Sequence, residues 1–212
     1  MRSASAERRA GAVALRARFQ WRARSTDPFD TLECVSEPSG RQALLRATIV
    51  IVARGGLRAL TYRAVAAEAG VSHGLVRHHF GTRDQLIAEA MDFGIEESLR
   101  ASNMLDGELT IAGFAAGIES LAERQGDIHA FQYELLLESR RRPELRETAE
   151  RYYRSYREAI DARLRRLGVV EPGFAELIWF ALDGLVFNQL VHPSDVAPAL
   201  GRIRALIEAA AG

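Results

Sequence analysis

Apolar residues recur with helical spacing along most of the chain. Within residues 41–54 they fall three or four positions apart, as they do on one face of a helix. The same spacing returns after short breaks that contain Gly or Pro, and no stretch of useful length alternates apolar and polar residues as a strand does. The pattern therefore predicts an all-α protein of about nine helices.

Capping residues and glycines predict where these helices begin and end. Two short helices, over residues 62–69 and 73–79, each follow a residue suited to the N-cap, Thr61 and Ser72. Gly70 ends the first helix and Gly81 ends the second. The sequence TRDQ has the capping-box pattern and predicts a longer helix from residue 82 to about 97. Five further helices are expected over about 108–124, 127–141, 143–167, 172–191 and 195–211.

These elements predict three regions. Residues 1–39 lack sustained periodicity, carry turn signals such as STDPFD and SEPSG, and hold seven Arg. They are expected to be a disordered or flexible basic leader, and an arm that reaches a DNA minor groove is the alternative. Residues 40–90 are expected to form a three-helix domain, and residues 91–212 a second helical domain.

The stretch VSHGLVRHHF, residues 71–80, places three of the five histidines beside an arginine. His73 and His78 are five residues apart and His78 and His79 are adjacent, so no pair has the i, i+4 spacing of a helical zinc site. No cysteine lies nearby, because the only one is Cys34. We therefore expect no metal at this site.

The apolar residues of the same stretch indicate a different role. Val71, Leu75, Val76 and Phe80 are placed to face a core shared with the preceding helix. The residues left on the outside are His73, Gly74, Arg77 and His78. Two short helices joined by AGVS have helix-turn-helix spacing, in which the second helix enters the major groove. A helical hairpin with merely solvated histidines is the alternative.

The stretch LTYRAVAAEAGVSHGLVRHHFGTRDQL, residues 60–86, resembles the N-terminal DNA-binding domain of TetR-family transcriptional regulators. Arg77 departs from the pattern, since it stands where the family usually has an aromatic residue. The resemblance implies that Thr61 and Arg63 contact phosphate. It also implies that a set of residues on the second helix faces the groove and that two others hold the adjacent backbone. The groove-facing set is Ser72, His73, Gly74, Arg77 and His78, and the backbone pair is His79 and Arg83.

The second domain offers a candidate dimer interface. The helix around residues 177–191, LIWFALDGLVFNQLV, is apolar on nearly every face and must be covered on all sides. A four-helix interface across a two-fold axis would cover it, with a palindromic operator as the consequence. A fully internal helix in a monomer is the alternative. The expected interface residues are Leu177, Phe180, Gly184, Phe187, Val191, Leu200, Ile203 and Leu206.

The resemblance also implies a ligand pocket in the second domain, and aromatic residues on its middle helices are the candidates. His129 and Glu134 would add polarity to such a pocket. The expected ligand-binding residues are Phe114, Phe131, Tyr133, Tyr152, Tyr156, Trp179 and Phe180.

Charge and composition agree with a protein that meets a polyanion. The formal net charge is zero, but residues 41–92 hold seven Arg against four acidic residues, whereas residues 93–212 hold fourteen against nineteen. The longest apolar run is shorter than a membrane span, and no signal peptide or enzyme motif is present. We therefore expect a bacterial, cytoplasmic, nucleoid-associated protein that is not an enzyme and needs no cofactor.

Taken with the resemblance, these features predict a dimeric, sequence-specific DNA-binding regulator. The expected partners are double-stranded DNA with a palindromic operator, a second copy of the chain and an unknown small molecule, with no membrane. The favoured mechanism is a repressor that the small molecule releases from its operator. The alternative is a DNA-binding protein without such a ligand, which acts architecturally or through a protein partner.

Overall fold

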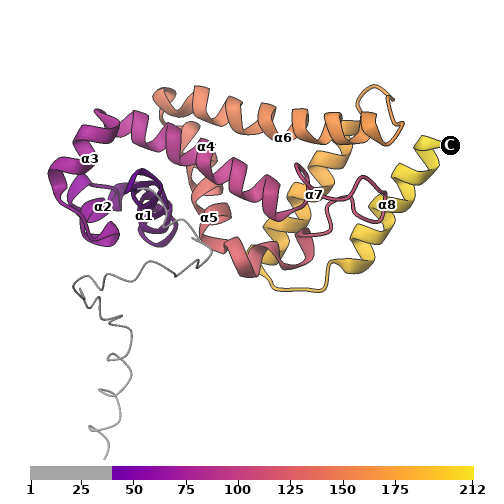
Figure 1. The fold of residues 1–212 in the computed structure, drawn as a ribbon, viewed down its shortest axis with the longest axis horizontal. Helices are drawn as coiled ribbons and strands as arrows, with labels where there is room; N and C mark the ends of the chain where they lie inside the picture. The colour runs from indigo at the N-terminus through magenta and orange to yellow at the C-terminus, as the bar shows by residue number, and fades with distance from the viewer. Residues whose placement is uncertain (1–39) are drawn as a thin grey trace, which may run out of the picture. The chain divides into compact units, whose positions relative to one another are not determined.

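The computed structural model describes residues 40–212, and the expected leader over residues 1–39 lies outside this range. The described chain forms eight α-helices and three short 3-10 helices, with no strand among these residues (Figure 1). The all-α class is therefore confirmed. The α-helices are α1 Gly40–Gly55, α2 Tyr62–Ala69, α3 His73–Phe80, α4 Arg83–Ala101, α5 Leu121–Ser139, α6 Arg146–Arg166, α7 Phe174–Val191 and α8 Ala197–Ala211; the 3-10 helices are η1 Leu57–Ala59, η2 Ile118–Ser120 and η3 Pro143–Leu145.

Local signals determine the first three helices and the start of the fourth. The Thr61 and Thr82 hydroxyls accept the N–H groups of the third residue after each, at 3.1 Å, and cap α2 and α4. Gly70 ends α2 with a φ of 68°, a left-handed conformation that glycine adopts without strain. Val65, Val76 and Phe80 are fully buried, so α2 packs against both α1 and α3 through one small core.

The longer helices form the rest of the described chain. α4 leaves the three-helix unit and packs against α5 and α6, while α5 packs against both α1 and α7 (Figure 1). α6 and α7 lie against each other, and α8 packs on α7 near the C-terminus. α4 and α5 therefore both run between the helix-turn-helix and the second domain.

The segment between α4 and α5 differs from the expected helix over 108–124. Residues 103–117 form turns, so the described residues hold eight α-helices rather than the nine expected. Gly117 lies so close to the Ala101 carbonyl that any side chain there would clash. Arg163, 2% exposed, donates to the Gly107 carbonyl at 2.7 Å and also to the Glu108 carbonyl. Because the Arg163 guanidinium satisfies these two carbonyls, they do not need the N–H partners that a helix would supply.

α7 is the most apolar helix of the described chain. Among residues 40–212 it alone has the length and composition that would suffice to cross a membrane. It also carries Glu176 and Asp183, and only 28% of it is buried within the chain. Much of its apolar surface is therefore not covered by the rest of the described chain.

Candidate functional site

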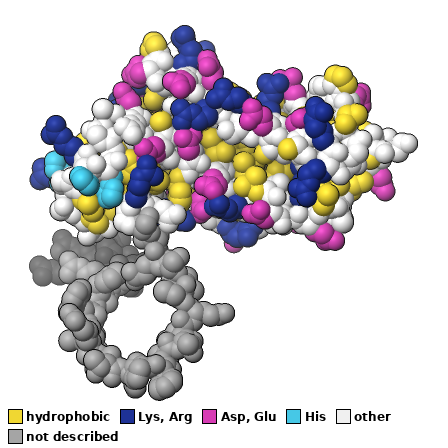
Figure 2. Space-filling view, turned by 45° about the horizontal axis from the view of Figure 1, so that its top comes forward, with side chains coloured by type: hydrophobic (Ala, Val, Ile, Leu, Met, Phe, Trp, Pro, Cys, Tyr) yellow, Lys and Arg dark blue, Asp and Glu magenta, His cyan; other side chains and the backbone are white. Residues whose placement is uncertain are grey.

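The α3 helix presents a polar surface at one end of the described chain. Ser72, His73, Arg77 and His78 are exposed, and His79 is half-buried. Figure 2 shows histidine side chains beside arginine side chains over this end of the molecule. His73, Arg77 and His78 therefore do lie on the outside of the helix-turn-helix, as expected.

The fold holds this surface in place from behind. Val76 and Phe80 anchor α3 in the core, and the Tyr62 hydroxyl donates to the Gly81 carbonyl at 2.9 Å, which ties α2 to the end of α3. Ser72 lies at the N-cap of α3 but its side chain makes no capping hydrogen bond, so its hydroxyl stays free for a partner. A Cβ on Gly74 would meet nothing within 4 Å. Packing within the chain does not require glycine there, and the open space suits close approach of another molecule.

Thr61, Arg63 and Arg83 lie at the edge of this surface. Thr61 and Arg63 are exposed at the start of α2, where phosphate contacts were expected. Arg83 is half-buried, and its guanidinium donates to the Leu57 carbonyl at 2.6 Å and to the Leu60 carbonyl at 3.3 Å. In this structure Arg83 therefore joins α4 to both ends of η1, and its phosphate role stays a prediction.

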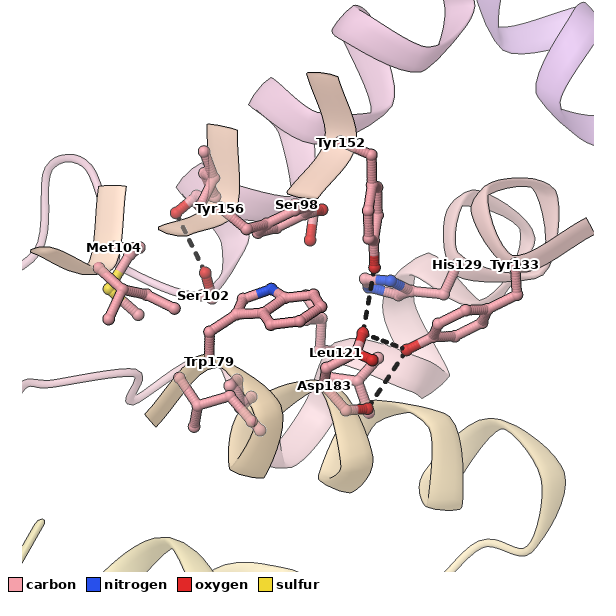
Figure 3. A pocket seen from close by; sticks show the side chains of 15 residues that line it. Ser98, Ser102, Met104, Leu121, His129, Tyr133, Tyr152, Tyr156, Trp179 and Asp183 are labelled. Atoms are coloured by element: carbon pink, nitrogen blue, oxygen red, sulfur yellow. Dashed lines mark hydrogen bonds between the residues drawn. The ribbon is translucent and has the colours of Figure 1, made fainter. Parts of the chain in front are cut away.

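A small cavity lies inside the second domain, lined by α4, η2, α5, α6 and α7 (Figure 3). Its volume is about 40 Å³, which is room for a few water molecules. Sites that enclose drug-sized ligands measure roughly 300–1,000 Å³. Most of the lining is apolar or aromatic. The lining residues are Ser98, Leu99, Ser102, Met104, Ile118, Leu121, His129, Tyr133, Tyr152, Tyr156, Ile160, Trp179, Leu182, Asp183 and Val186.

Two tyrosines converge on an acid at the centre of this lining. The Tyr133 and Tyr152 hydroxyls donate to Asp183 Oδ1 at 3.0 Å and 3.1 Å, as Figure 3 shows. Burial raises the pKa of Asp183, and the two hydroxyls oppose that rise because they stabilise the carboxylate. Burial also raises the pKa of Tyr133 and of Tyr152, and the nearby Asp183 charge adds to both shifts. Both tyrosines therefore stay neutral hydrogen-bond donors.

His129 adds an unusual polar group beside this acid. Its side chain is 3% exposed, and its Nε2 is buried without a hydrogen-bond partner. Burial lowers the pKa of His129 to about 4, and a hydrogen bond to Gln132 offsets part of that effect. The ring is therefore neutral near pH 7. Among the described residues no group of three or more His, Cys, Asp or Glu side chains is arranged to hold a metal ion.

The cavity gathers four of the seven ligand-binding candidates, namely Tyr133, Tyr152, Tyr156 and Trp179. Phe114 and Phe131 are fully buried in the core outside the lining, and Phe180 is 57% exposed on the opposite side of α7. Glu134 also lies outside the lining; its carboxylate accepts the Leu57 N–H at 3.3 Å.

Asp183 was not among the expected pocket residues. The available signal was a single acid within an otherwise apolar helical run, since an ionised side chain needs polar partners wherever that helix is covered. Ser98 and Met104 gave no comparable signal, because nothing in their local sequence separates them from ordinary helix residues.

The far side of α7 forms an uncovered stripe. Leu177, Phe180, Phe187 and Val191 are 50–67% exposed, and Gly184 is exposed between them. Their alternating spacing of three and four residues is that of a seam between two packed helices. On α8, Leu206 is 54% exposed, whereas Leu200 and Ile203 are buried in the core of the same chain. The α7 stripe, with Leu206, is thus the part of the expected interface that is free to meet a partner.

Comparison with known proteins assigns both halves of the described chain. Residues 44–90 match the family model described as bacterial regulatory proteins, tetR family. Residues 105–212 match the model described as tetracyclin repressor-like, C-terminal domain.

Individual relatives agree with these matches. The HTH-type transcriptional repressor Rv3405c of Mycobacterium tuberculosis is 42% identical over 59 residues, which cover 26% of this chain and 31% of the relative. The match thus spans about a third of that relative's length. A TetR-family member from Streptomyces coelicolor, SCO1917, is 25% identical with a TM-score of 0.62, covering 81% of this chain and 98% of the other. The multidrug binding protein EbrR, solved in complex with ethidium, is 26% identical with a TM-score of 0.57 and the same two coverages.

Proposed function

Because the chain belongs to the TetR family of bacterial transcriptional regulators, we propose that it is a dimeric, sequence-specific repressor released from its operator by a small molecule. The observation that carries the proposal is the exposed row of His73, Arg77 and His78 on a helix anchored by the Val76 and Phe80 core. The protein would act in the bacterial cytoplasm, on the nucleoid. Residues 40–90 would read DNA, and residues 91–212 would bind the ligand and the second subunit.

The α3 surface supplies the groups that a major groove accepts. Arg77 presents a planar guanidinium, which suits a bidentate contact to guanine O6 and N7. His73 and His78 offer ring N–H donors to base edges or phosphate oxygens. Gly74 leaves room for the helix backbone to approach the duplex. The proposed contacts need no movement within the helix-turn-helix, because all of these groups are already exposed.

A second copy of the chain would cover the α7 stripe. Large apolar side chains that are half exposed along one helix face indicate an interaction surface rather than an ordinary solvent-exposed surface. Two such helices related by a two-fold axis would bring Gly184 against its counterpart, where a missing side chain permits close packing. The two helix-turn-helix units of the dimer would then contact DNA half-sites about one helical turn, roughly 34–36 Å, apart. The operator is accordingly expected to be palindromic.

The cavity would allow a ligand to control DNA binding. At about 40 Å³ it is too small for most ligands, so a ligand would bind an expanded state better than the state described here. That difference in affinity is what allows a ligand to shift a conformational equilibrium. Ser98 and Leu99 of α4 line the cavity, and the same helix starts directly after α3. Expansion of the cavity would therefore move α4 and, with it, the helix-turn-helix units that bind DNA.

The test is selection of binding sites from random duplex DNA with the purified full-length chain, followed by affinity measurements on the enriched sequence. We expect a palindrome, and a loss of about 1–3 kcal/mol with relaxed preference at one base pair for Arg77→Ala. Arg140→Ala, which removes an exposed arginine from the end of α5, is the matched control. If no sequence is enriched over random duplex, the proposal is wrong. If an operator is found but no metabolite in a screen releases it, the ligand-controlled mechanism is wrong.

A further inference from the structure

The polar groups of the cavity are arranged around one unbalanced acid. Of the fifteen lining residues only Asp183 is acidic, and none is an arginine. Among the described residues, no basic side chain forms an ion pair with Asp183 either. The other polar groups near it are tyrosine hydroxyls and the unprotonated His129 ring. The cavity therefore holds an acid that no cation of the described chain balances.

We propose that this cavity binds a small organic ammonium ion whose charge pairs with Asp183 and whose aromatic body packs among Tyr152, Tyr156 and Trp179. The inference rests on the proposed function in one respect, since it identifies the chemical class of the releasing ligand. The binding chemistry itself does not depend on DNA.

Electrostatics favours a cation over a neutral or acidic ligand. Both tyrosine hydroxyls donate to Oδ1 of Asp183, so neither occupies Oδ2. Tyr152 is 2% exposed and Trp179 is 4% exposed, and a cation held against such buried aromatic faces gains further attraction from their π systems. A carboxylate group in a ligand would instead meet Asp183 as a like charge.

His129 points to a ligand with an N–H group rather than a quaternary nitrogen. His129 lines the same cavity, and its Nε2 is buried without a hydrogen-bond partner, which is a costly arrangement for a polar atom. The neutral ring is able to accept a hydrogen bond at this atom. An ammonium group would then donate both to Asp183 and to His129, which Figure 3 shows on the same side of the cavity.

The remaining lining limits the size of the ligand. Leu99, Leu121, Ile160 and Val186 give the cavity apolar walls, and its volume of about 40 Å³ means that the ligand binds the expanded state of the cavity. A single aromatic ring on a short linker is therefore a more suitable first probe than a fused polycyclic dye. The 2-phenylethylammonium ion meets this description, and 2-phenylethanol and phenylacetate are its neutral and anionic counterparts of similar shape.

Titration calorimetry on the full-length chain without DNA tests the inference. We expect 2-phenylethylammonium to bind about tenfold or more tightly than 2-phenylethanol, with no measurable binding of phenylacetate. Asp183→Asn should remove this preference, whereas Glu176→Gln, which neutralises a half-exposed acid outside the cavity on the same helix, should preserve it. Equal affinity for the ammonium ion and the alcohol, or a preference that survives Asp183→Asn, would overturn the proposal.

A second variant tests the hydrogen bond to His129. His129→Phe should weaken the binding of the 2-phenylethylammonium ion but not that of its N,N,N-trimethyl derivative, because the derivative has no N–H to donate. If the binding of both cations is weakened equally, the His129 ring only shapes the cavity, and this part of the inference is overturned. Circular dichroism of each variant checks that it is folded.

The two proposals fail in different ways. A chain that selects an operator but shows no preference for the ammonium ion refutes the inference alone. A chain that binds the ammonium ion through Asp183 but enriches no duplex refutes the proposed function and leaves the cavity chemistry standing.

Discussion

The buried ring of His129 should make the protein lose stability when the pH falls below the usual range of histidine. In the unfolded chain the ring takes up a proton near pH 6.5, whereas in the folded chain its pKa is about 4. Between these values the unfolded state binds more protons, so the free energy of unfolding decreases as the pH decreases. From pH 7.5 to pH 5.0 this one residue should account for a loss of about 2 kcal/mol.

Urea unfolding at the two pH values, at one protein concentration, measures this effect. His129→Gln cannot titrate, and it should lose about 2 kcal/mol less than the parent over the same interval. His192→Gln removes an exposed ring and is the control. The reasoning would be refuted by a His129→Gln variant that loses as much stability as the parent between pH 7.5 and 5.0.

Three further predictions test other contacts. Arg83→Ala should lower the free energy of unfolding by about 1–3 kcal/mol in urea, because the Leu57 and Leu60 carbonyls lose a charged donor; if instead stability is unchanged and the salt slope of DNA binding falls by about one, Arg83 is a phosphate contact. Phe187→Glu should give a monomer in light scattering, whereas Leu137→Glu, at a comparably exposed position on α5, should not; a dimeric Phe187→Glu would exclude the α7 stripe as the interface. Glu134→Ala should raise amide hydrogen exchange at Leu57 about tenfold, because that N–H loses its acceptor, and unchanged exchange would mean that the contact does not hold η1.

The helix-turn-helix could be predicted from sequence because its signals are local. Thr61 and Thr82 cap the helices that directly follow them, and Gly70 ends α2 in the conformation that its lack of a side chain allows. The exposed face of α3 follows in the same way, since Val76 and Phe80 fix which side is buried. Each of these inferences depends on residues within a few positions of one another.

The cavity could not be predicted in the same way, because distant residues create it. The segment over 103–117 was expected to be partly helical, and it is held instead by Arg163, more than fifty positions further along the chain. A helix that is apolar all round, such as α7, does not reveal which of its faces turns inward. That Asp183 meets Tyr133 and Tyr152, and that Phe180 faces outward, follow only from the packing of α5, α6 and α7.

The arrangement of α7 also makes its length intolerant of change. Asp183 lines the cavity, and the very next residue, Gly184, belongs to the exposed stripe. One residue inserted into the first half of the helix would turn everything beyond it by about 100°. Tyr133 and Tyr152 would lose their shared acceptor, and the α7 stripe would be interrupted at the same position. Homologues of this protein are accordingly expected to differ in the amino acids of α7 but to keep its length.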